Sequence, residues 1–536
     1  MISKHTCNMT YLLTAVLALS AMTACEEKDL YPDTGKDWEG TTDFFLTEDE
    51  RQFATYYKPY VGNVGDPMPF YDPVSSTFKV LYLQDFEANR EGTYHPIWGV
   101  ETADGASYVS LGEIVPCGTI DEQDAALGTG CAVYDEQNGL YYIYYTGNKY
   151  LPSSSESGQV VMRAVSRDFK TWTKDLTFSL RGIDDGYSRN DFRDPCIFQD
   201  DDGRWHMLVS TMKDTKGVLA EYVSDDLDSW TCNGDFMPMM WDRFYECPDV
   251  FKMGEWWYMV YSEKHSSIRK VQYFKGKTID ELKSCTLNDA AVWPDSHEGF
   301  LDTRAFYAGK TASDGKTRLI WGWCPTRTGM DNTEVGAAPA EPNWGGAMVC
   351  HELRQNEDGT LVCVAPESVK AKYAENSDMK VMSGEGYRLE NGDYIMESGS
   401  HILFSRLSAH NKITFTAGAG GTGAKFAVSF ARGGDSEKYY SIVVNPEDEG
   451  ANRKINFEEA GPEGMGFIEG IDSYKFPTPQ DNIYNVTVIT DNSVCTVYIN
   501  DTVVFTNRIY GIARNCWSLD CLEGNVTISN LSVTEY

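Results

Sequence analysis

The sequence predicts an all-β protein in which a β-propeller is followed by a C-terminal β-sandwich. Short apolar and aromatic runs separated by turn residues fill most of the chain, long amphipathic helical patterns are nearly absent, and one turn motif recurs. The 536 residues are enough for several domains with separate cores. Charged residues make up 24% of the chain and hydrophobic residues 42%, which is ordinary for a globular protein.

The first residues are predicted to be a targeting segment. Residues 11–21 form an apolar run that is too short to span a bilayer, and small residues follow it up to Cys25. This arrangement resembles a bacterial lipoprotein signal, so we expect residues 1–24 to be removed and Cys25 to carry a lipid. An ordinary secretory signal is the alternative.

The residues after Cys25 indicate where such a lipoprotein would reside. Residues 26–29 form a charged cluster that resembles the signal for the outer face of the outer membrane in the Bacteroidetes. A surface-exposed outer-membrane lipoprotein is therefore expected, with the periplasmic face as the alternative. Residues 25–43 are polar and predict a flexible tether. No other run is long enough for a membrane span, so contact with the membrane is expected only through the anchor.

Residues 44–366 are predicted to form the propeller. Apolar-aromatic runs, each followed by turn residues, occur at 78–84, 140–147, 204–211, 255–263 and 317–323. The segments SRDFKTW (166–172) and SDDLDSW (224–230) share a Ser/Asp turn that ends in Trp. Repeated strand–turn–strand units are typical of propeller blades, and a sandwich would not explain the recurring turn.

Residues 383–536 are predicted to form the sandwich, after a polar linker at 367–382. Apolar residues alternate cleanly with Thr and Tyr in runs such as 484–490 and 494–500, and residues 490–493 read as the hairpin turn between them. Such alternation predicts sheets with one buried face.

Net charge argues against a nucleic-acid partner, and the cysteine pattern argues against disulfides and metal sites. The chain has 46 Lys+Arg and 80 Asp+Glu, a net charge of −34, so no nucleic-acid partner is expected. Outside Cys7 and Cys25 the cysteines show no CxxC pair and lie in apolar contexts, which favours buried free thiols over disulfides. The sequence shows no cluster of metal ligands, and neither a metal nor an organic cofactor is expected.

Three acidic residues are the candidate catalytic groups. Asp66, Asp194 and Glu246 stand among apolar residues, each with a Pro one or two positions later. A carboxylate in apolar surroundings is costly unless it is paired or used. A single Asp-Pro pair is more often a turn. Three such acids in different predicted blades are expected to converge on the propeller axis.

Glycoside hydrolysis needs such a set of acids. One carboxylate attacks the anomeric carbon, and a carboxylic acid with a raised pKa protonates the leaving oxygen. If configuration is retained, these two carboxyl groups are expected to lie about 5–5.5 Å apart. The aromatic flank of Glu246 favours a raised pKa there, which leaves Asp66 as the nucleophile. Arg193 is expected to keep Asp194 ionised and to donate to a sugar hydroxyl.

These motifs resemble glycoside hydrolase family 32, the invertases, inulinases and levanases. The family's Asn-Asp-Pro-Asn, Arg-Asp-Pro and Glu-Cys motifs correspond here to residues 65–68, 193–195 and 246–249. Supporting blocks stand at 95–99, 129–133, 144–148, 305–309, 343–353 and 484–501. The resemblance implies a five-bladed propeller, a β-sandwich and retaining cleavage of β-fructofuranosyl bonds in fructans such as levan or inulin. An outward lipid anchor favours endo-acting cleavage.

The resemblance also assigns roles to individual residues. It implies that Asp66 is the nucleophile, Asp194 the transition-state stabiliser and Glu246 the acid/base. The substrate-binding residues that it implies are Gln84, Trp98, Thr129, Arg193 and Cys247. No cofactor or metal is implied.

The chain departs from the family pattern beside the nucleophile. Gly65 stands where the family has Asn, Met68-Pro69 stand where it has Asn-Gly, and Asn63 replaces a Trp. The lost amides would hydrogen-bond the terminal fructose, and such losses change discrimination between sugars. A propeller hydrolase for another furanoside, of the arabinose type, and a catalytically weak glycan-binding lipoprotein are therefore the alternatives.

Overall fold

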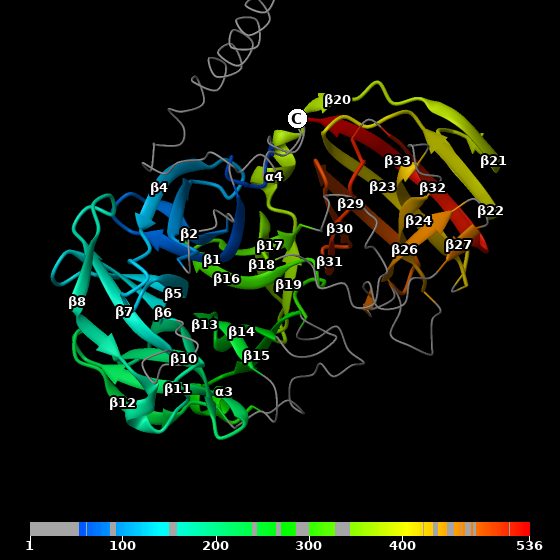
Figure 1. The fold of residues 1–536 in the computed structure, drawn as a ribbon. Helices are drawn as coiled ribbons and strands as arrows, with labels where there is room; N and C mark the ends of the chain where they lie inside the picture. Colours follow the sequence, from blue (N-terminus) through cyan, green and yellow to red (C-terminus); the bar gives the residue numbers. More distant parts are fainter. Residues whose placement is uncertain are drawn as a thin grey trace, which may run out of the picture.

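Two bodies of β-strands lie side by side, the propeller formed by the first part of the chain and the sandwich by the last (Figure 1). The structure is a computed structural model, and it describes residues 53–60, 62–85, 93–149, 158–237, 244–263, 270–285, 300–326, 344–421, 423–432, 438–446, 455–461, 464–466, 473–474, 479–513 and 515–536. The predicted leader, the tether and Cys25 lie outside these residues.

The propeller strands form five blades around a common centre, which confirms the predicted five-bladed propeller (Figure 1). The first and last blades join into one sheet, because Val64 pairs with Gly346. Blades 1 and 2 consist of β1 (Asn63–Asp72), β2 (Thr77–Asp85), β3 (Ile97–Thr102) and β4 (Val109–Val115), and of β5 (Ala126–Asp135), β6 (Leu140–Lys149), β7 (Gly158–Ser166) and β8 (Thr173–Leu180). Blades 3 to 5 consist of β9 (Phe192–Gln199), β10 (Trp205–Lys213), β11 (Lys216–Ser224) and β12 (Thr231–Asp235), of β13 (Tyr245–Met253), β14 (Trp256–Glu263) and β15 (Val271–Gly276), and of β16 (Tyr307–Ser313), β17 (Arg318–Pro325), β18 (Gly346–Gln355) and β19 (Leu361–Val364).

Successive strands within each blade pair antiparallel. Second strands such as β6 and β14 are almost wholly buried because each blade packs between two neighbours, so they are continuously apolar. The outer strand β8 instead consists of exposed and partly buried residues. Short helices stand between strands: η3 (Gly182–Asp185), α3 (Ile279–Lys283) and α4 (Glu367–Lys372).

The recurring turn motif has one geometry in both copies. It links the third and fourth strands of blades 2 and 3. The Asp168 Oδ1 atom accepts from the N–H groups two and three residues later at 2.9 and 2.8 Å, and Asp226 Oδ1 does the same at 2.9 and 2.8 Å. The following residues, Phe169 and Leu227, have φ of 58° and 60°. The sequence repeat therefore marks a structural repeat of the blade.

The innermost strands β1, β5, β9, β13 and β16 contact one another in a closed ring. In each of them the pairing register with the second strand shifts near the start of the strand, at Gly65/Met68, Gly128/Gly130, opposite Leu208/Ser210, at Glu246/Asp249 and at Tyr307/Lys310. A β-bulge re-aims a side chain locally. The five bulges lie at the same level of the ring, so five blades present side chains toward one point on the axis.

The C-terminal body is the predicted sandwich. Its strands are β20 (Glu375–Asn376), β21 (Val381–Glu390), β22 (Asp393–Phe404), β23 (His410–Ala419), β24 (Lys425–Arg432), β25 (Tyr439–Val444), β26 (Ile455–Gly461), β27 (Gly464–Gly466), β28 (Ser473–Tyr474), β29 (Ile483–Asp491), β30 (Val494–Ile499), β31 (Val503–Arg508), β32 (Cys516–Glu523) and β33 (Asn525–Glu535). Strand β22 pairs with β21, β32 and β33, which connects all of them into one sheet folded around a core. Phe404 stacks on Trp517 in that core, with centroids 4.4 Å apart.

One outer face of the sandwich packs against the propeller. Val486, Val488 and Val497 point into the sandwich core, as the alternation predicts. Their neighbours Ile489 and Tyr498 belong to a second core cluster that includes propeller residues. Both faces of β29 and β30 are therefore buried at this junction, which fixes the two bodies against each other.

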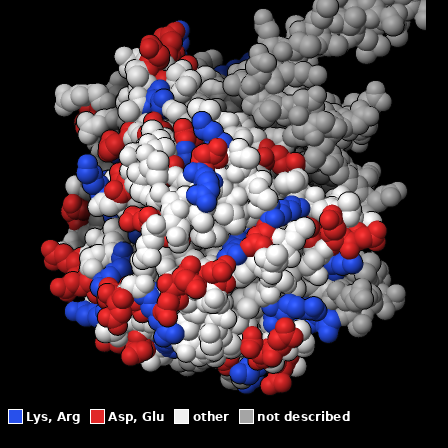
Figure 2. Space-filling model, turned by 90° about the vertical axis from the view of Figure 1, so that its left-hand side faces the viewer, with Lys and Arg blue, Asp and Glu red and all other residues white. Residues whose placement is uncertain are grey.

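The described surface of the propeller carries charged side chains of both signs. Asp and Glu are interspersed with Lys and Arg on the propeller side in Figure 2. The described cysteines are free thiols, and most are buried. No helix in the described part of the chain is long and apolar enough to cross a membrane.

Candidate active site

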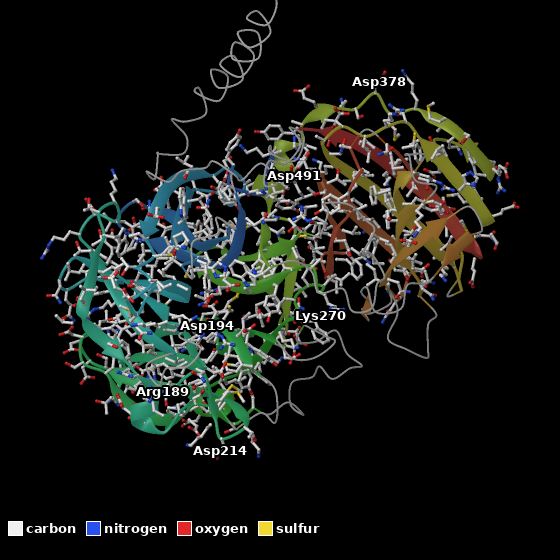
Figure 3. All side chains as sticks on the ribbon, viewed as in Figure 1. Arg189, Asp194, Asp214, Lys270, Asp378 and Asp491 are labelled. Atoms are coloured by element: carbon white, nitrogen blue, oxygen red, sulfur yellow. The ribbon has the colours of Figure 1, made fainter. Side chains whose placement is uncertain are left out.

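The three predicted acids meet where the inner strands surround the propeller axis. Asp66, Asp194 and Glu246 belong to β1, β9 and β13, and Asp194 lies near the middle of the propeller (Figure 3). Asp66 and Asp194 have φ of 40° and 58°, and Cys247, next to Glu246, has φ of 50°. Positive φ is costly for residues with a side chain and concentrates at functional sites. The bulges thus impose the strained backbone that turns these side chains to the axis.

Asp66 is held by two neutral donors. Its Oδ2 atom accepts from the Thr129 hydroxyl at 2.7 Å, and its Oδ1 atom accepts from the Trp323 indole N–H at 3.0 Å. Burial raises the pKa of the Asp66 carboxyl and the charge of Glu246 raises it further, whereas both hydrogen bonds oppose the rise. The two donors fix the orientation of the carboxylate without neutralising its charge.

Asp194 is almost completely buried, with 3% of its surface exposed. Its Oδ2 atom accepts from the Cys247 backbone N–H at 2.9 Å, and its own N–H donates to the Thr146 hydroxyl at 3.0 Å. Burial raises the pKa of the Asp194 carboxyl to about 6 against the opposing field of Arg193, with Glu246 and Asp66 adding to the rise. Burial and the neighbouring acids therefore disfavour the charged form of Asp194, while Arg193 and the Cys247 N–H favour it.

Glu246 lies between a cation and a phenol. Its Oε1 atom accepts from Arg193 Nη2 at 2.9 Å, and its Oε2 atom accepts from the Tyr307 hydroxyl at 2.7 Å. Arg193 also donates to Asp191 at 2.9 Å, and its guanidinium lies over the Phe244 ring, 3.9 Å from the centroid. The charge of Arg193 opposes the rise in the Asp194 pKa, in the direction that the sequence predicts. The hydrogen bond of Arg193 goes to Glu246, because neighbouring residues of a strand point in different directions.

Thr129 and Cys247 connect the carboxylates. The Thr129 hydroxyl donates to Asp66 and lies 3.8 Å from the Cys247 sulfur, while the Cys247 N–H donates to Asp194. Burial raises the pKa of the Cys247 thiol well above its usual value, and the charges of Asp66 and Asp194 add to the effect. The thiol therefore stays neutral beside the carboxylates and serves as a buried spacer between blades 2 and 4.

Gln84 lies on β2, next to β1, and Trp98 lies on β3, next to β2. Gln84 pairs with Val64 across β1 and β2, and Trp98 packs in one core cluster with Cys247 and Trp323. Both side chains are 2% exposed. Trp98 Nε1 is a buried donor with no hydrogen-bond partner among the described residues. Unsatisfied buried donors are rare in folded proteins, so this N–H is available to a ligand.

Two site residues were missed in the sequence. Tyr307 and Trp323, both from blade 5, donate to Glu246 and Asp66. Tyr307 occupies in β16 the position at the start of the bulge that Glu246 occupies in β13. It stands in the AFYAG block at 305–309, and that block was the available signal. Trp323 lies on a second strand, and nothing in its local sequence distinguishes it from a core tryptophan.

Sulfur and polar side chains just beyond the bulges link neighbouring blades. Met68 Sδ accepts from the Gly130 N–H at 3.1 Å, the Cys131 and Cys196 sulfurs accept from backbone N–H groups of the next blade, and Asp249 Oδ2 accepts from the Thr311 N–H at 2.9 Å. The Met68 side chain, at a position where the family pattern has an amide, therefore makes a contact between blades. No three His, Cys, Asp or Glu side chains of the described residues could hold a metal ion.

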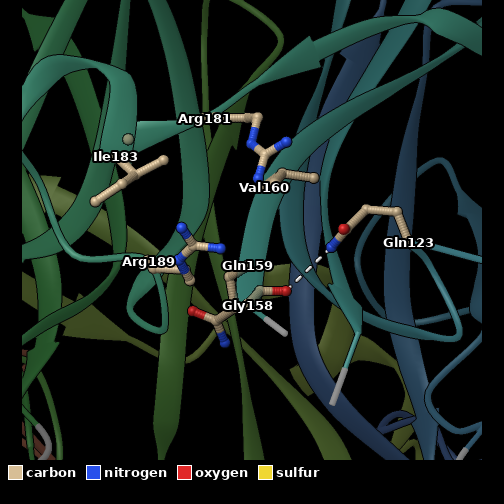
Figure 4. A pocket seen from close by; sticks show the side chains of 8 residues that line it. Gln123, Gly158, Gln159, Val160, Arg181, Ile183 and Arg189 are labelled. Atoms are coloured by element: carbon tan, nitrogen blue, oxygen red, sulfur yellow. Dashed lines mark hydrogen bonds between the residues drawn. The ribbon is translucent and has the colours of Figure 1, made fainter. Parts of the chain in front are cut away.

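A recess between blades 2 and 3 lies beside the site. Figure 4 shows side chains that line it: Gln123, Gln159, Val160, Arg181, Ile183 and Arg189. The Gln123 amide donates to Gly158 O at 3.0 Å across the recess. Gln159 Oε1 accepts from the N–H of Phe192 at 3.0 Å and from Arg193 Nη1 at 3.4 Å. Gln159 therefore connects this recess to Arg193.

Comparisons with known proteins identify both bodies. The family model for the N-terminal domain of glycosyl hydrolases family 32 matches residues 57–364. The model for the BT1760-like C-terminal domain of the same family matches residues 359–533.

Curated relatives are distant. A sucrose-6-phosphate hydrolase of Escherichia coli is 22% identical over 86% of this chain and 91% of its own length. The β-fructofuranosidase isoenzyme CWINV2 of Arabidopsis thaliana is 25% identical over 46% of this chain, and the match spans 45% of that protein. The chain thus spans about half the length of the first such relatives.

Solved structures share the whole architecture. Fructan 1-exohydrolase IIa of Cichorium intybus superposes with a TM-score of 0.67 at 16% identity, over 91% of this chain and 98% of that one. Exo-inulinase of Aspergillus awamori gives a TM-score of 0.68 at 16% identity, over 92% of this chain and 99% of the other. At this identity the likeness concerns the fold.

Proposed function

The chain belongs to glycosyl hydrolase family 32, and on this premise we propose that it is a retaining glycoside hydrolase that cleaves β-fructofuranosyl linkages in fructans. The observation that carries the proposal is the group of three carboxylates on the propeller axis, each in a different environment. Carboxylates with distinct surroundings can take distinct parts in acid–base chemistry.

Asp66 is the nucleophile in this mechanism. The hydrogen bonds from Thr129 and Trp323 lower the pKa of the Asp66 carboxyl and so favour the charged form, which can attack the anomeric carbon to form a covalent fructosyl-enzyme. A water molecule then cleaves this ester with Glu246 as the base. Two displacements at the same carbon retain the configuration.

Glu246 is the acid/base. Tyr307 and Arg193 each hold one of its oxygens, which positions the carboxyl group for proton transfer. When the carboxyl gives its proton to the leaving oxygen, the carboxylate that forms is stabilised by the guanidinium of Arg193. The same pair then favours the form that accepts a proton from water in the second step.

Asp194 stabilises the transition state. A sugar ring develops positive charge at the anomeric carbon during cleavage. The charged form of a buried carboxylate is disfavoured by burial, so a positive charge that develops beside it interacts with it strongly. Gln84 and the unpartnered N–H of Trp98 are the proposed donors or acceptors for sugar hydroxyls.

Fructan is the proposed substrate, and the protein would act on it at the cell surface. Relatives include a fructan exohydrolase and β-fructofuranosidases, which supports a fructoside as substrate. The lipoprotein-like Cys25 motif supports anchoring at the outer membrane, facing outward. A surface enzyme that shortens polymer before import would cut internally, so we propose endo action.

The test is the product profile at an early time point with levan and with inulin. Fructo-oligosaccharides formed early support endo action, while fructose alone contradicts it and leaves the hydrolase proposal intact. No release from either polymer or from sucrose contradicts the proposed reaction. The Glu246→Gln protein is the matched control, because it keeps the shape of the side chain without the acid.

A second candidate substrate is another furanoside glycan. The observation that favours it is the residue pattern beside Asp66: Gly65 has no side chain and Met68 accepts a backbone hydrogen bond. A site without those amides has fewer hydrogen-bonding groups that select fructose by its hydroxyls. A panel of arabinofuranoside and fructofuranoside substrates separates the two candidate functions. The fructan hydrolase requires turnover of fructofuranosides, and the second candidate requires turnover of arabinofuranosides.

A further inference from the structure

A row of aromatic rings leads away from the carboxylates. Tyr307, which donates to Glu246, packs against Trp323, which donates to Asp66, with centroids 5.7 Å apart. Trp323 meets Trp344 at 6.0 Å, Trp344 stacks on His95 at 4.0 Å with an angle of 16° between the rings, and His95 meets Tyr94 at 4.8 Å.

The row runs from the interior to the surface. Trp323 is 0% exposed, Trp344 and His95 are partly exposed, and Tyr94 is 42% exposed. An aromatic row that served only the core would end in buried rings, as the neighbouring Trp321 does. The exposed end leaves the outer rings within reach of a ligand in solvent.

Gly65 lets Trp344 stand directly beside Asp66. A Cβ atom at residue 65 would lie 2.1 Å from Trp344 Cη2, which no side chain permits. The six-membered ring of the indole therefore lies against the backbone of the residue that precedes Asp66. The absent side chain at position 65 leaves room for an aromatic wall rather than a gap.

His95 adopts a strained conformation to join the row. Its φ is 62°, a region that non-glycine residues seldom occupy, and the ring nevertheless stacks nearly parallel on Trp344. Strain of this kind persists where the surroundings impose it, and it concentrates at ligand sites. At the outer end the Asn148 amide donates to the Tyr94 hydroxyl at 3.2 Å, which orients that ring.

We propose that Trp344, His95 and Tyr94 form an aromatic platform that binds successive sugar units of an oligosaccharide whose terminal or cleaved unit lies at Asp66. Sugar rings have apolar faces of C–H groups and a polar edge, so they stack on aromatic rings while their hydroxyls stay solvated. The inference rests on the proposed function, because it assigns the rings to subsites next to the same carboxylates.

The platform predicts a length-dependent specificity. Trp344 contacts the unit nearest Asp66, and Tyr94 contacts a unit further along the chain. Substrates long enough to reach Tyr94 therefore bind more tightly than a disaccharide. Each stacking contact is worth about threefold to tenfold in affinity, the range typical of aromatic contacts.

The test compares full-length wild type with Tyr94→Ala, His95→Ala, Trp344→Ala and Trp344→Phe on fructo-oligosaccharides of two to six units. We expect Tyr94→Ala to raise KM more for long than for short substrates, with kcat little affected, and His95→Ala to do so from a shorter length onward. Trp344→Phe keeps an aromatic ring and should lose less than Trp344→Ala. Tyr536→Ala, an exposed tyrosine of the sandwich, is the matched control and should change no KM.

Equal KM ratios at every length in an active wild type would overturn the platform and leave the hydrolase intact. If wild type cleaves no fructoside, the proposed function fails, and calorimetric titration of the same oligosaccharides then decides the platform alone. Weaker binding of long chains by Tyr94→Ala supports it there, and unchanged binding overturns it. Thermal unfolding verifies that each variant is folded.

Discussion

The carboxylates on the propeller axis and those at the junction with the sandwich are all largely shielded from solvent, but their surroundings differ. At the junction Asp302 accepts from the N–H groups of Thr303 and Thr506 at 2.7 and 2.9 Å, and from His351 Nε2 at 3.0 Å. Asp491 accepts from three successive backbone N–H groups, those of residues 54–56, at 2.8–3.0 Å. In Figure 3 Asp491 lies between the two bodies and Asp194 lies inside the propeller.

On the axis the carboxylates face one another. Burial and neighbouring acids raise the pKa values of Asp66 and Asp194, and both residues have positive φ. At the junction each acid is surrounded by donors, and neither Asp302 nor Asp491 has positive φ. The comparison teaches that donors arranged around one acid hold a fold together, whereas mutual repulsion and strain mark a site that awaits a ligand.

The largest expected effect is the loss of turnover in Glu246→Gln. The amide cannot donate a proton to the leaving oxygen, so we expect kcat to fall about 10²- to 10⁴-fold, the usual contribution of general acid–base catalysis. Reducing-sugar release from fructan measures it. The exposed Glu255→Gln is the control and should keep full activity. Undiminished hydrolysis by Glu246→Gln would place the acid elsewhere.

At the junction, loss of a carboxylate should lower the stability of the protein and leave its turnover unchanged. Asp302→Ala leaves His351 and the two threonine N–H groups buried without their acceptor, which we expect to lower the free energy of unfolding by about 3–5 kcal/mol. Denaturant unfolding followed by tryptophan fluorescence measures the loss. The kcat per folded molecule should stay within about twofold of wild type. A stable but inactive Asp302→Ala protein would contradict the assignment of a structural role to the junction carboxylates.

Asp194→Asn should gain stability while it loses activity. Because the folded-state pKa of Asp194 is about 6 against a usual value of 3.8, the folded protein retains a proton that the unfolded chain releases, and stability falls as pH rises from about 4 to about 6. Removing this titration should stabilise the variant by about 2–3 kcal/mol at pH 7 and by little below pH 4. Thermal unfolding at both pH values measures the difference.

The pH dependence has a kinetic counterpart in wild type. The charged form of Asp194 is lost below about pH 6, so kcat/KM should decline on the acid side of that value. A stability gain for Asp194→Asn that is equal at pH 4 and pH 7 would contradict the raised pKa, since only the titrating carboxyl makes the difference depend on pH.

The smallest expected effect concerns Tyr307→Phe. The variant removes one neutral donor from Glu246 Oε2, and the loss of such a hydrogen bond costs about 1 kcal/mol, or roughly fivefold in kcat/KM. Steady-state kinetics with a short fructan measure it. Tyr187→Phe is a matched control, because Tyr187 donates to Asp235 away from the axis. Equal losses in both variants would mean that the Tyr307 bond acts on folding rather than on Glu246.

Much of the fold could be predicted from local patterns. The repeated turns at Asp168 and Asp226 have one geometry because Ser, Asp and the residues that follow them dictate it locally. The alternation in β29 placed Val486 and Val488 in the sandwich core. It could not indicate that the opposite face, with Ile489, packs on the propeller, because a second partner surface leaves no mark in a short sequence window.

The candidate site divides in the same way. By itself the sequence determined an all-β chain of two bodies and the three acids Asp66, Asp194 and Glu246, since charges set among apolar residues before Pro are visible in the order of residues. Only the tertiary structure decided that Arg193 pairs with Glu246, that Tyr307 and Trp323 hold the acids, and that Trp344 fills the space above Gly65. Those contacts join blades that are far apart in sequence, and closure of the propeller ring brings them together.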